Sequence, residues 1–273
     1  MVYLKSLISN LQDLQTIELD ILDYIADFCE TNHLRYFLIG GTLLGAVRHH
    51  GFIPWDNDID ICMPRPDYDR LGQLMDSQAD SIYRLLRVNN KNNYFAPYFK
   101  LTDTRTYLVE TDTPYRMDEM GAFIDIFPVD GICSDFVKAE RIRFTVDKWS
   151  RRISRATPEF EGLGLQEKIK KMIMVAMFRP LGRANLLKLL SDVMRQYPYD
   201  QSDYVVSTFG LRGKKEIVDC GIFSDHVFLE FEKKQYRAPI GYDTYLKRMY
   251  GNYMELPPVE ERFQPHTIKV WWR

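Results

Sequence analysis

Three aspartates occupy alternate positions in the stretch FIPWDNDIDICMPRPDYDRL, residues 52–71: Asp56, Asp58 and Asp60. In a strand, alternate side chains share a face and lie roughly 7 Å apart, so Asp58 and Asp60 would point one way and Ile59 and Ile61 the other way. Two carboxylates placed like this repel each other unless a cation lies between them. Mg²⁺ prefers oxygen ligands and bridges carboxylates to substrate phosphates, so we predict that Asp58 and Asp60 bind one or two Mg²⁺, with Mn²⁺ as an alternative.

A further carboxylate stands alone in an apolar strand pattern, as Asp125 of FIDIF, residues 123–127. Burial of an unpaired carboxylate is costly, and a metal ion would remove that cost. We therefore predict that Asp125 is the third metal ligand and a catalytic residue beside Asp58 and Asp60. The alternative is a buried aspartate that is hydrogen-bonded to backbone. Asp56 follows Pro54–Trp55, and we expect it to orient the start of the strand.

The apolar run RYFLIGG, residues 35–41, ends in two glycines that are followed by Thr42. A strand that turns at Gly40 and Gly41 into a helix can offer backbone N–H groups and a hydroxyl to a phosphate. Double-glycine turns are common, but this one lies 17 residues before Asp58. We therefore expect Gly40, Gly41 and Thr42 to bind substrate, with Thr42 as the N-cap of the helix that follows.

The block IGGTLLGAVRHHGFIPWDNDIDI, residues 39–61, closely resembles the LicD family, whose members have a nucleotidyltransferase fold of the polymerase-β type. Many LicD relatives have Asp where this chain has Asn57, so that position is not expected to bind metal. The resemblance covers nearly the whole chain and is weakest in residues 138–195. Its motif residues are Gly40, Gly41, Thr42, Asp58, Asp60 and Asp125, and further family-like pieces are YFKLTDTRT (98–106), FIDIFPVDG (123–131) and YGNYMELPPVEER (250–262).

The resemblance implies a phosphotransferase that uses a cytidine diphosphate donor. Bacterial LicD members are similar to enzymes that move phosphocholine from CDP-choline onto a sugar hydroxyl of a teichoic acid or lipopolysaccharide precursor, whereas the animal relatives that resemble fukutin use CDP-ribitol. We expect a CDP-choline-like donor and a lipid-linked glycan acceptor. Two alternatives remain open: a nucleotidyltransferase that adds a nucleoside monophosphate to a small molecule, and an inactive scaffold in glycan assembly.

Other residues are candidates for substrate binding. Lys100 lies in an apolar strand pattern, where its ammonium needs either a substrate phosphate or an internal ion pair. Arg48 follows the glycine turn and could reach a phosphate or form a plain salt bridge. Trp55 could contribute to an aromatic site for choline, because quaternary ammonium groups favour ring faces, or it could pack in the core. Arg262 and His266 either close over the nucleotide or only pack.

The elements that must position these residues follow from hydrophobic periodicity. Apolar residues at three- and four-residue steps predict an amphipathic helix from Leu11 to Phe28. Short apolar runs bounded by glycine or proline predict strands. The alternation favours an α+β fold, with a nucleotidyltransferase-like mixed sheet flanked by helices. Further strands are expected within 35–41, 58–63, 94–103 and 122–132, and further helices within 42–51 and 67–77.

Residues 138–195 differ from the rest in charge, because their 14 basic and 6 acidic side chains give a net charge of +8. We predict a catalytic core at 1–137, a basic helical appendage at 138–195, and a C-terminal part, 196–273, that completes the core and closes over the donor. Within the appendage, basic residues surround the apolar run of KIKKMIMVAMFRPLGRANLLKLL. This pattern fits contact with anionic lipid, and it also fits an ordinary solvated helix that covers the sheet.

Bulk composition excludes several classes of protein. The net charge of −2 and a pI near 6.2 argue against a general nucleic-acid binder. Residues 1–15 lack the apolar run of a signal peptide, and no stretch reaches the ~18 apolar residues of a membrane span. The cysteines are scattered and form no metal-binding pattern, so we expect reduced thiols in a cytoplasmic protein, with peripheral contact at the inner membrane face as one role of the appendage.

Overall fold

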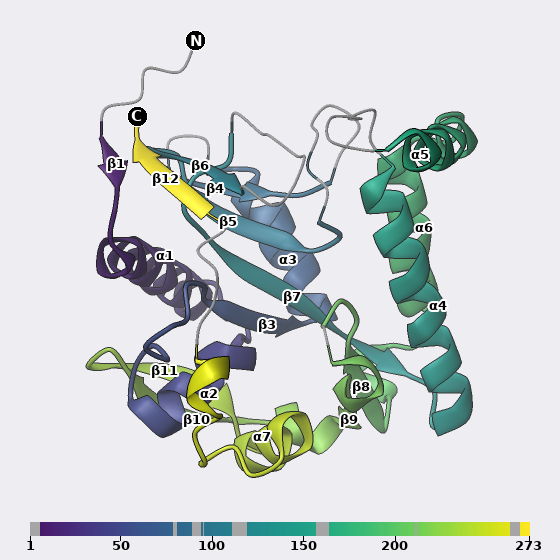
Figure 1. Cartoon of the computed structure of the whole chain (residues 1–273). Helices are drawn as coiled ribbons and strands as arrows, with labels where there is room; N and C mark the ends of the chain where they lie inside the picture. The colour runs from purple at the N-terminus through teal and green to yellow at the C-terminus, as the bar shows by residue number, and fades with distance from the viewer. Residues whose placement is uncertain are drawn as a thin grey trace.

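The computed structural model describes residues 6–78, 81–88, 94, 96–110, 119–156, 164–210, 212–262 and 268–273. Within these residues a seven-stranded mixed sheet forms the centre of the molecule, in the order β2-β3-β7-β5-β4, and β8 and β9 extend it beyond β7 (Figure 1). Its strands are β2 (Phe37–Leu38), β3 (Asp60–Pro64), β4 (Tyr83–Leu86), β5 (Phe99–Asp103), β7 (Phe123–Ile132), β8 (Tyr204–Ser207) and β9 (Ile217–Asp219).

Two smaller sheets flank the central one. A three-stranded sheet brings residues near both chain ends together, in the order β1-β12-β6, and β10 and β11 form an antiparallel hairpin. Their strands are β1 (Leu7–Ile8), β6 (Thr106–Glu110), β10 (His226–Phe231), β11 (Lys234–Pro239) and β12 (Ile268–Trp272). The described helices are α1 (Leu11–Thr31), α2 (Gly40–His49), α3 (Arg65–Met75), α4 (Phe136–Arg155), α5 (Leu165–Phe178), α6 (Arg183–Met194) and α7 (Tyr242–Tyr250).

The α+β prediction is confirmed, and the strands expected near the aspartates are present. β3 and β7 are parallel neighbours, whereas β2, β5 and β8 pair antiparallel with them. β3 is shorter than the sequence pattern suggests, because it begins at Asp60. Asp58 therefore lies in the extended segment before the strand rather than within it.

Local chemistry explains where α1 and α3 begin. Asn10 caps α1 by accepting a hydrogen bond from the Asp13 N–H at 2.7 Å. The strand β3 stops at Pro64 and passes directly into α3. α3 packs against one face of the sheet, where Tyr68 stacks on Phe99 with ring centroids 3.9 Å apart.

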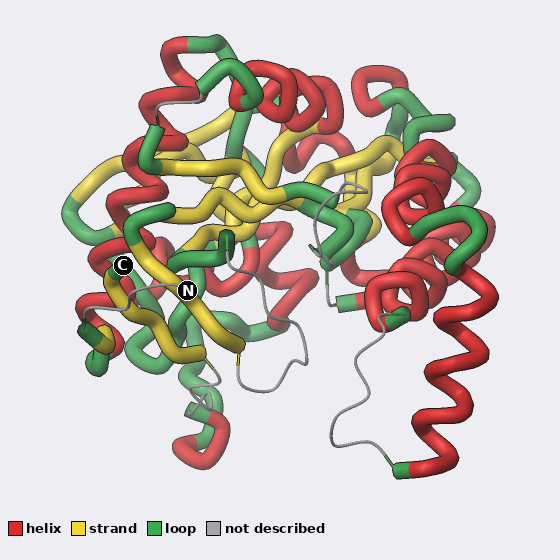
Figure 2. Tube along the Cα trace, turned by 90° about the horizontal axis from the view of Figure 1, so that it is seen from above, coloured by secondary structure: helices red, strands yellow, loops and turns green. Residues whose placement is uncertain are grey.

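The helices α4, α5 and α6 lie together at one side of the sheet, which Figures 1 and 2 both show. A small apolar cluster joins them, made of Ile153 from α4, Phe178 from α5 and Leu187 from α6. These helices account for the described residues of the predicted appendage, and the C-terminal part contributes β8 and β9 to the central sheet. The domain boundaries themselves remain a prediction.

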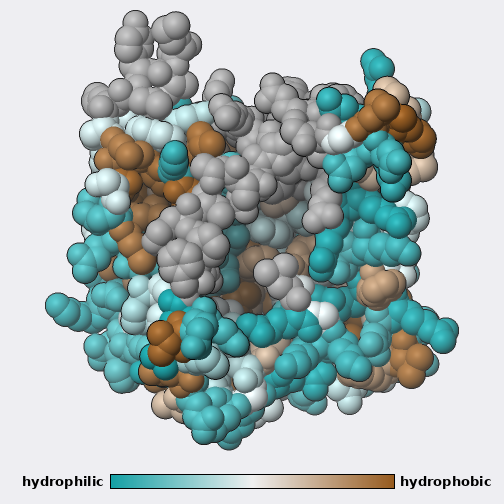
Figure 3. Space-filling view, viewed as in Figure 1, coloured by the Kyte–Doolittle hydropathy of each residue, from teal (hydrophilic) through white to brown (hydrophobic). Residues whose placement is uncertain are grey.

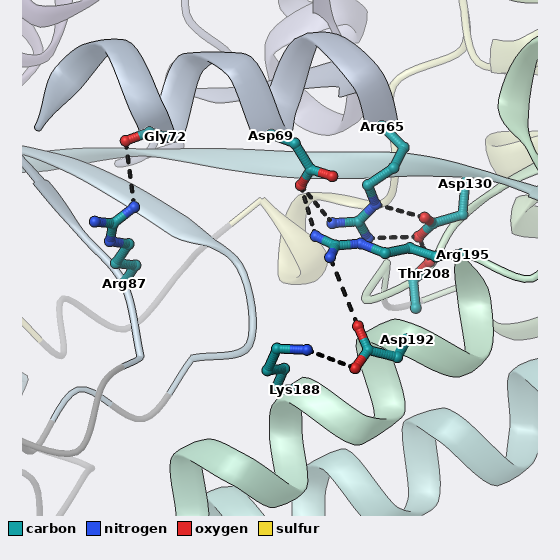
Figure 4. Close-up of polar contacts among 9 residues, drawn as sticks. All are labelled: Arg65, Asp69, Gly72, Arg87, Asp130, Lys188, Asp192, Arg195 and Thr208. Atoms are coloured by element: carbon teal, nitrogen blue, oxygen red, sulfur yellow. Dashed lines mark hydrogen bonds and ion pairs between the residues drawn. The ribbon is translucent and has the colours of Figure 1, made fainter.

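An ionic network, buried at Arg65 and Asp130 and exposed at Arg195, joins the sheet to α3 and to the helical side (Figure 4). Arg65 on α3 donates two hydrogen bonds to the carboxylate of Asp130 on β7, at 2.6 and 2.8 Å. Thr208, just after β8, donates to the same carboxylate. Arg195, which follows α6, forms an ion pair with Asp69 on α3 at 2.6 Å. The helical side is thus tied to the core by charge as well as by apolar packing.

No described helix combines the length and the hydropathy that a membrane crossing requires. The four cysteines are free thiols, as expected from their spacing.

Candidate active site

Strand register places three charged residues in one row across the centre of the sheet. Asp60 on β3 pairs with Asp125 on β7, and Lys100 on β5 pairs with Asp125 from the other side. Residues that face each other in register point to the same face of a sheet. The structure therefore brings Asp60 and Asp125 together, although 65 residues separate them in the sequence.

Lys100 is an internal partner of this row. Its ammonium nitrogen lies 2.7 Å from Asp125 Oδ1, and both side chains are buried. Lys100 also lies over the Phe123 ring, 3.4 Å from its centroid. Of the two alternatives for Lys100, the structure contains the internal ion pair.

The glycine turn lies directly against the carboxylates. Gly40 has a positive φ of 59°, and a Cβ atom there would lie 2.9 Å from Asp60 Oδ2. A Cβ atom at Gly41 would collide with Asp56 Oδ2. Only glycine combines this backbone conformation with so close an approach. The positive end of α2 thus faces two carboxylates, which its dipole stabilises.

The expected role of Thr42 as N-cap is wrong. The left-handed conformation of Gly40 starts α2 two residues earlier, so that Ile39 is the N-cap. The Thr42 hydroxyl instead accepts a hydrogen bond from the Asp60 N–H at 2.8 Å, and Thr42 is buried. It thereby fixes the start of β3 and the position of Asp60.

The carboxylates are crowded and removed from water. Burial, followed by the charge of Asp58, raises the pKa of Asp56 to about 8. The same two causes, in the same order, raise the pKa of Asp60. Burial also raises the pKa of Asp125, which the ammonium of Lys100 opposes, and the balance lies at about 6. Asp56, which we expected only to orient the strand, is therefore part of the acidic cluster.

A fifth carboxylate, Glu18 of α1, belongs to the same cluster. Glu18 is only 2% exposed, and its Oε2 atom makes no hydrogen bond with any group that the structure describes. Burial raises its pKa well above the usual range, followed by the charges of Asp58, Asp56, Asp125 and Asp60. The sequence carried a signal for it, because Glu18 interrupts the apolar face of α1 between Leu14 and Leu22.

The composition of this cluster suits a divalent cation. Its potential ligand atoms are carboxyl oxygens, the type that Mg²⁺ prefers. Burial raises the pKa of Glu18, Asp56 and Asp60, and a bound cation would favour their charged forms. Among the described residues, no three acidic, His or Cys side chains are already arranged around a common point at which a metal could sit. The donor set therefore fits Mg²⁺ in type and charge, and the ligand geometry stays a prediction.

A cavity of about 1450 Å³ opens beside the acidic cluster. Gly40, Gly41, Asp58, Asp60 and Asp125 line it, together with residues of α4, α7 and the segments around 210 and 255. This volume is large enough for a substrate of nucleotide size. The acidic cluster is therefore accessible from a substrate-sized cleft.

Aromatic side chains form one wall of this cleft next to the acidic row. Phe127 follows Asp125 by two residues on β7 and so shares its face. The centroid of the Tyr98 ring lies 4.4 Å from that of the Phe127 ring and 6.4 Å from that of the Phe209 ring. We call Tyr98, Phe127 and Phe209 the aromatic wall. Trp55 lines the cleft as well, near His49, with ring centroids 6.5 Å apart.

Cationic side chains line other parts of the cleft. Arg212 lies over the Tyr250 ring, 3.9 Å from its centroid, and Lys215 donates to the Met249 carbonyl at 3.2 Å. Arg48 lines the cleft and donates to the carbonyl oxygens of Tyr253 and Glu255 at 2.8 and 3.3 Å. The sequence analysis predicted Arg48 as a substrate-binding residue but not Arg212 or Lys215. Their positions depend on how residues 212–250 pack against the core.

The two remaining candidates lie in the C-terminal segment. Arg262 donates to the Pro257 carbonyl at 2.8 Å and so braces its own segment. His266 lies outside the described residues. Their roles in closing over the nucleotide stay predictions.

Comparison with known proteins adds to this geometry. Residues 33–154 match the family model described as LicD/FKTN/FKRP, nucleotidyltransferase domain, which spans the glycine turn and all the aspartates of the cluster. Over 266 residues the chain is 33% identical to the lipopolysaccharide cholinephosphotransferase LicD of Haemophilus influenzae, covering 95% of this chain and 96% of that protein. The chain belongs to the LicD family.

A second relative in this family matches a shorter stretch. The human ribitol 5-phosphate transferase FKRP is 41% identical over 59 residues, which is 22% of this chain and 12% of that protein. The mouse FKRP protein gives the same values. The resemblance inferred from residues 39–61 is thus confirmed over nearly the full length of this LicD-family chain.

Proposed function

We propose that this LicD-family protein transfers phosphocholine from CDP-choline to a sugar hydroxyl of a lipid-linked lipopolysaccharide or teichoic acid precursor. The observation that carries the proposal is the 33% identity to the Haemophilus influenzae cholinephosphotransferase, because it extends over 95% of the chain. The cleft beside the acidic cluster supports it, since a diphosphate needs a cation and room.

In this proposal Asp58, Asp60 and Asp125 hold Mg²⁺, which when bound neutralises the charge of the donor diphosphate and of the departing CMP. The acceptor oxygen forms a bond to the phosphorus that carries choline, and the bond between that phosphorus and the oxygen of CMP breaks. Asp125 takes the hydroxyl proton, as a carboxylate within hydrogen-bond reach can do. Lys100 positions Asp125 through their ion pair.

The glycine turn and the cationic side chains have separate roles. Gly40 and Gly41 let the carboxylates approach the positive end of α2, so the acidic cluster is held in place before substrate arrives. Arg48, Arg212 and Lys215 line the cleft, and we assign them to the phosphate and nucleotide portions of the donor.

The choline group requires a different environment. A trimethylammonium group favours aromatic ring faces, and the aromatic wall lies next to Asp125. We therefore assign choline to the aromatic wall, with Trp55 as the alternative. Phe209→Leu and Trp55→Leu proteins separate the two, because only the residue that contacts choline should change the preference for CDP-choline over CDP-ethanolamine.

Product mass tests the reaction. Incubation of the protein with Mg²⁺, CDP-choline and a glycan acceptor should add phosphocholine to the acceptor and release CMP. An acceptor that gains CMP instead would establish the nucleotidyltransferase alternative. An Asp58→Ala protein that kept full turnover would show that the acidic cluster is not the site of the chemistry.

The match to the FKRP proteins keeps ribitol phosphate as a second candidate for the transferred group. Calorimetry with Mg²⁺ can compare CDP-choline, CDP-ribitol and CTP. We expect CDP-choline to bind most tightly. Tighter binding of CDP-ribitol would move the assignment to ribitol phosphate, and binding of CTP alone would overturn the donor class.

A further inference from the structure

The helix α5 exposes an apolar face to solvent. Figure 3 shows a hydrophobic patch at the upper right, where α5 lies in Figure 1. Five large apolar side chains of α5 are exposed, and their exposed fractions are 76% for Leu165, 44% for Ile169, 57% for Met172, 63% for Ile173 and 56% for Met177. Exposed apolar side chains on one helix face mark an interaction surface more often than scattered ones do.

These side chains lie on one continuous face. At about 100° per residue, the five residues span an arc of roughly 140° around the helix. Phe178 and Met174 lie on the opposite side and pack against α4 and α6 in the small apolar cluster. Helix α5 therefore uses one side for the fold, and no residue that the structure describes covers the other side.

Basic side chains border this apolar face on both sides. On the same helical projection, Lys168 lies at one edge of the arc and Lys170 at the other, and both are exposed. Arg179, exposed at the end of the helix, lies on the Lys168 side. Glu167 is the acidic residue of this helix, and it accepts a hydrogen bond from the Gly164 N–H at the first turn. The border of the apolar face is thus positive.

We propose that α5 docks the protein on an anionic lipid bilayer, with its apolar face in the interface and Lys168, Lys170 and Arg179 at the level of the headgroups. Charge selects this occupant, because a positive border around an apolar stripe is complementary to a bilayer whose surface is negative and whose interior is apolar. The helix is far too short to span a membrane, so this is surface attachment.

Docking would place the active-site cleft near a lipid-linked acceptor, and that consequence rests on the function proposed above. The α4 side chains of Asp147, Ser150, Arg151 and Ser154 line the cleft, and α4 packs against α5. An acceptor whose lipid stays in the bilayer under α5 would therefore present its sugar from the α4 side.

Vesicle co-sedimentation of the full chain tests the proposal without any donor or acceptor. The chain should bind vesicles of phosphatidylcholine with about 30% phosphatidylglycerol, and it should bind pure phosphatidylcholine vesicles far less. An Ile169→Ser, Ile173→Ser protein should lose roughly tenfold or more of the partition coefficient, because two apolar anchors are gone. A Lys168→Gln, Lys170→Gln protein should lose about fivefold for each lysine, which corresponds to about 1 kcal/mol per charge.

A matched control changes one exposed apolar and one exposed basic side chain elsewhere on the surface. Phe228 on β10 is 55% exposed and Lys269 on β12 is exposed, so Phe228→Ser, Lys269→Gln should bind vesicles like the unaltered chain. Equal losses in the control and in the α5 variants, or no binding of the unaltered chain to anionic vesicles, would overturn the proposal. Self-association that the α5 serines abolish, without vesicle binding, would assign the face to a second copy and overturn it as well.

Activity separates this proposal from the proposed function. With a water-soluble acceptor fragment, the α5 variants should keep the turnover of the unaltered chain, and with an acceptor embedded in anionic vesicles they should lose it in parallel with binding. If phosphocholine transfer itself fails while vesicle binding and its dependence on α5 hold, the surface assignment stands and the reaction assignment falls.

Discussion

The acidic cluster and the exposed face of α5 both depart from the usual distribution, in which charged side chains are exposed and apolar ones are buried. The two departures are opposite. In the cluster, Glu18, Asp56 and Asp125 are buried although they are acidic, and burial raises the pKa of each. On α5, side chains such as Ile173 are exposed although they are apolar. Each arrangement is costly in the isolated chain, and each cost would fall on binding of the partner proposed above: a cation in the cluster and a bilayer on the helix. Departures of this kind indicate where a protein meets its ligands.

The two regions also differ in how firmly they are held. Strand register, the glycine turn and the hydrogen bond of Thr42 fix the carboxylates of Asp60 and Asp125 from several sides. The helix α5 packs through one small cluster around Phe178. Chemistry needs atoms fixed to fractions of an ångström, whereas docking on a fluid surface does not. The difference in support therefore fits the difference in proposed role.

The strongest test of this comparison removes a charge from the cluster. An Asp58→Asn protein should lose about a thousandfold or more in kcat, because the proposed metal would supply several kcal/mol of charge stabilisation in the transition state. Circular dichroism should show an unchanged fold, and steady-state kinetics measures the loss. The matched change Asp27→Asn, on the exposed side of α1, should leave kcat within about twofold.

The next test compares a buried ion pair of the core, which joins α3 to the sheet, with an exposed ion pair on the helical side that carries α5. Arg65→Met leaves the buried carboxylate of Asp130 without its charged partner, which should lower the free energy of unfolding by about 3–5 kcal/mol. Urea denaturation measures it. Lys188→Met removes an exposed ion pair with Asp192 and should cost less than about 0.5 kcal/mol. If Arg65→Met were equally mild, the network would not be what ties α3 to the sheet.

A smaller effect is expected at Glu18. A Glu18→Gln protein keeps the shape of the side chain but avoids the protonation of a buried carboxyl group whose pKa is raised, so the free energy of unfolding near pH 7 without metal should rise by about 1 kcal/mol or more. Because the acidic cluster then offers one carboxyl group fewer to a cation, Mg²⁺ should raise Tm less than it does in the unaltered chain. Thermal denaturation with and without Mg²⁺ measures both. An unchanged Mg²⁺ response would place Glu18 outside the metal's influence.

The smallest effect is expected on α5. An Ile173→Ser protein should change the free energy of unfolding by less than about 0.5 kcal/mol, because the side chain is already 63% exposed. Phe178→Ser on the same helix removes a buried side chain and should cost about 3 kcal/mol. A large loss with Ile173→Ser would mean that the exposed face contributes to the fold, and the contrast with the acidic cluster would disappear.

Much of the site could be predicted because its signals are local. Alternating aspartates, a glycine pair and an acid within an apolar run each have a direct physical meaning, and they led to Asp58, Asp60 and Asp125. The element types around them were also predictable from periodicity. The boundaries of the helices and strands were harder to predict. The helix α2 starts at Gly40, which has a positive φ that the sequence does not reveal.

The rest depends on contacts between distant segments. Lys100 meets Asp125 only because β5 pairs with β7 in one particular register, and a shift by one residue would point it to the opposite face. The sequence shows Glu18 as an acidic residue on the apolar face of a helix, but it does not show that Glu18 lies beside the aspartates of the acidic cluster. Likewise, Arg212 reaches the cleft because β8 and β9 join the central sheet and α7 contributes to the lining of the cleft.

Arg48 holds the segment at 253–255 through main-chain carbonyl oxygens. These hydrogen bonds do not depend on the side chains of the segment, since every residue type has the same main-chain carbonyl. The lining of the cleft on that side could therefore be exchanged for other side chains without losing its anchor. Altered substrate preference could be engineered there first, provided that the arginine is left in place.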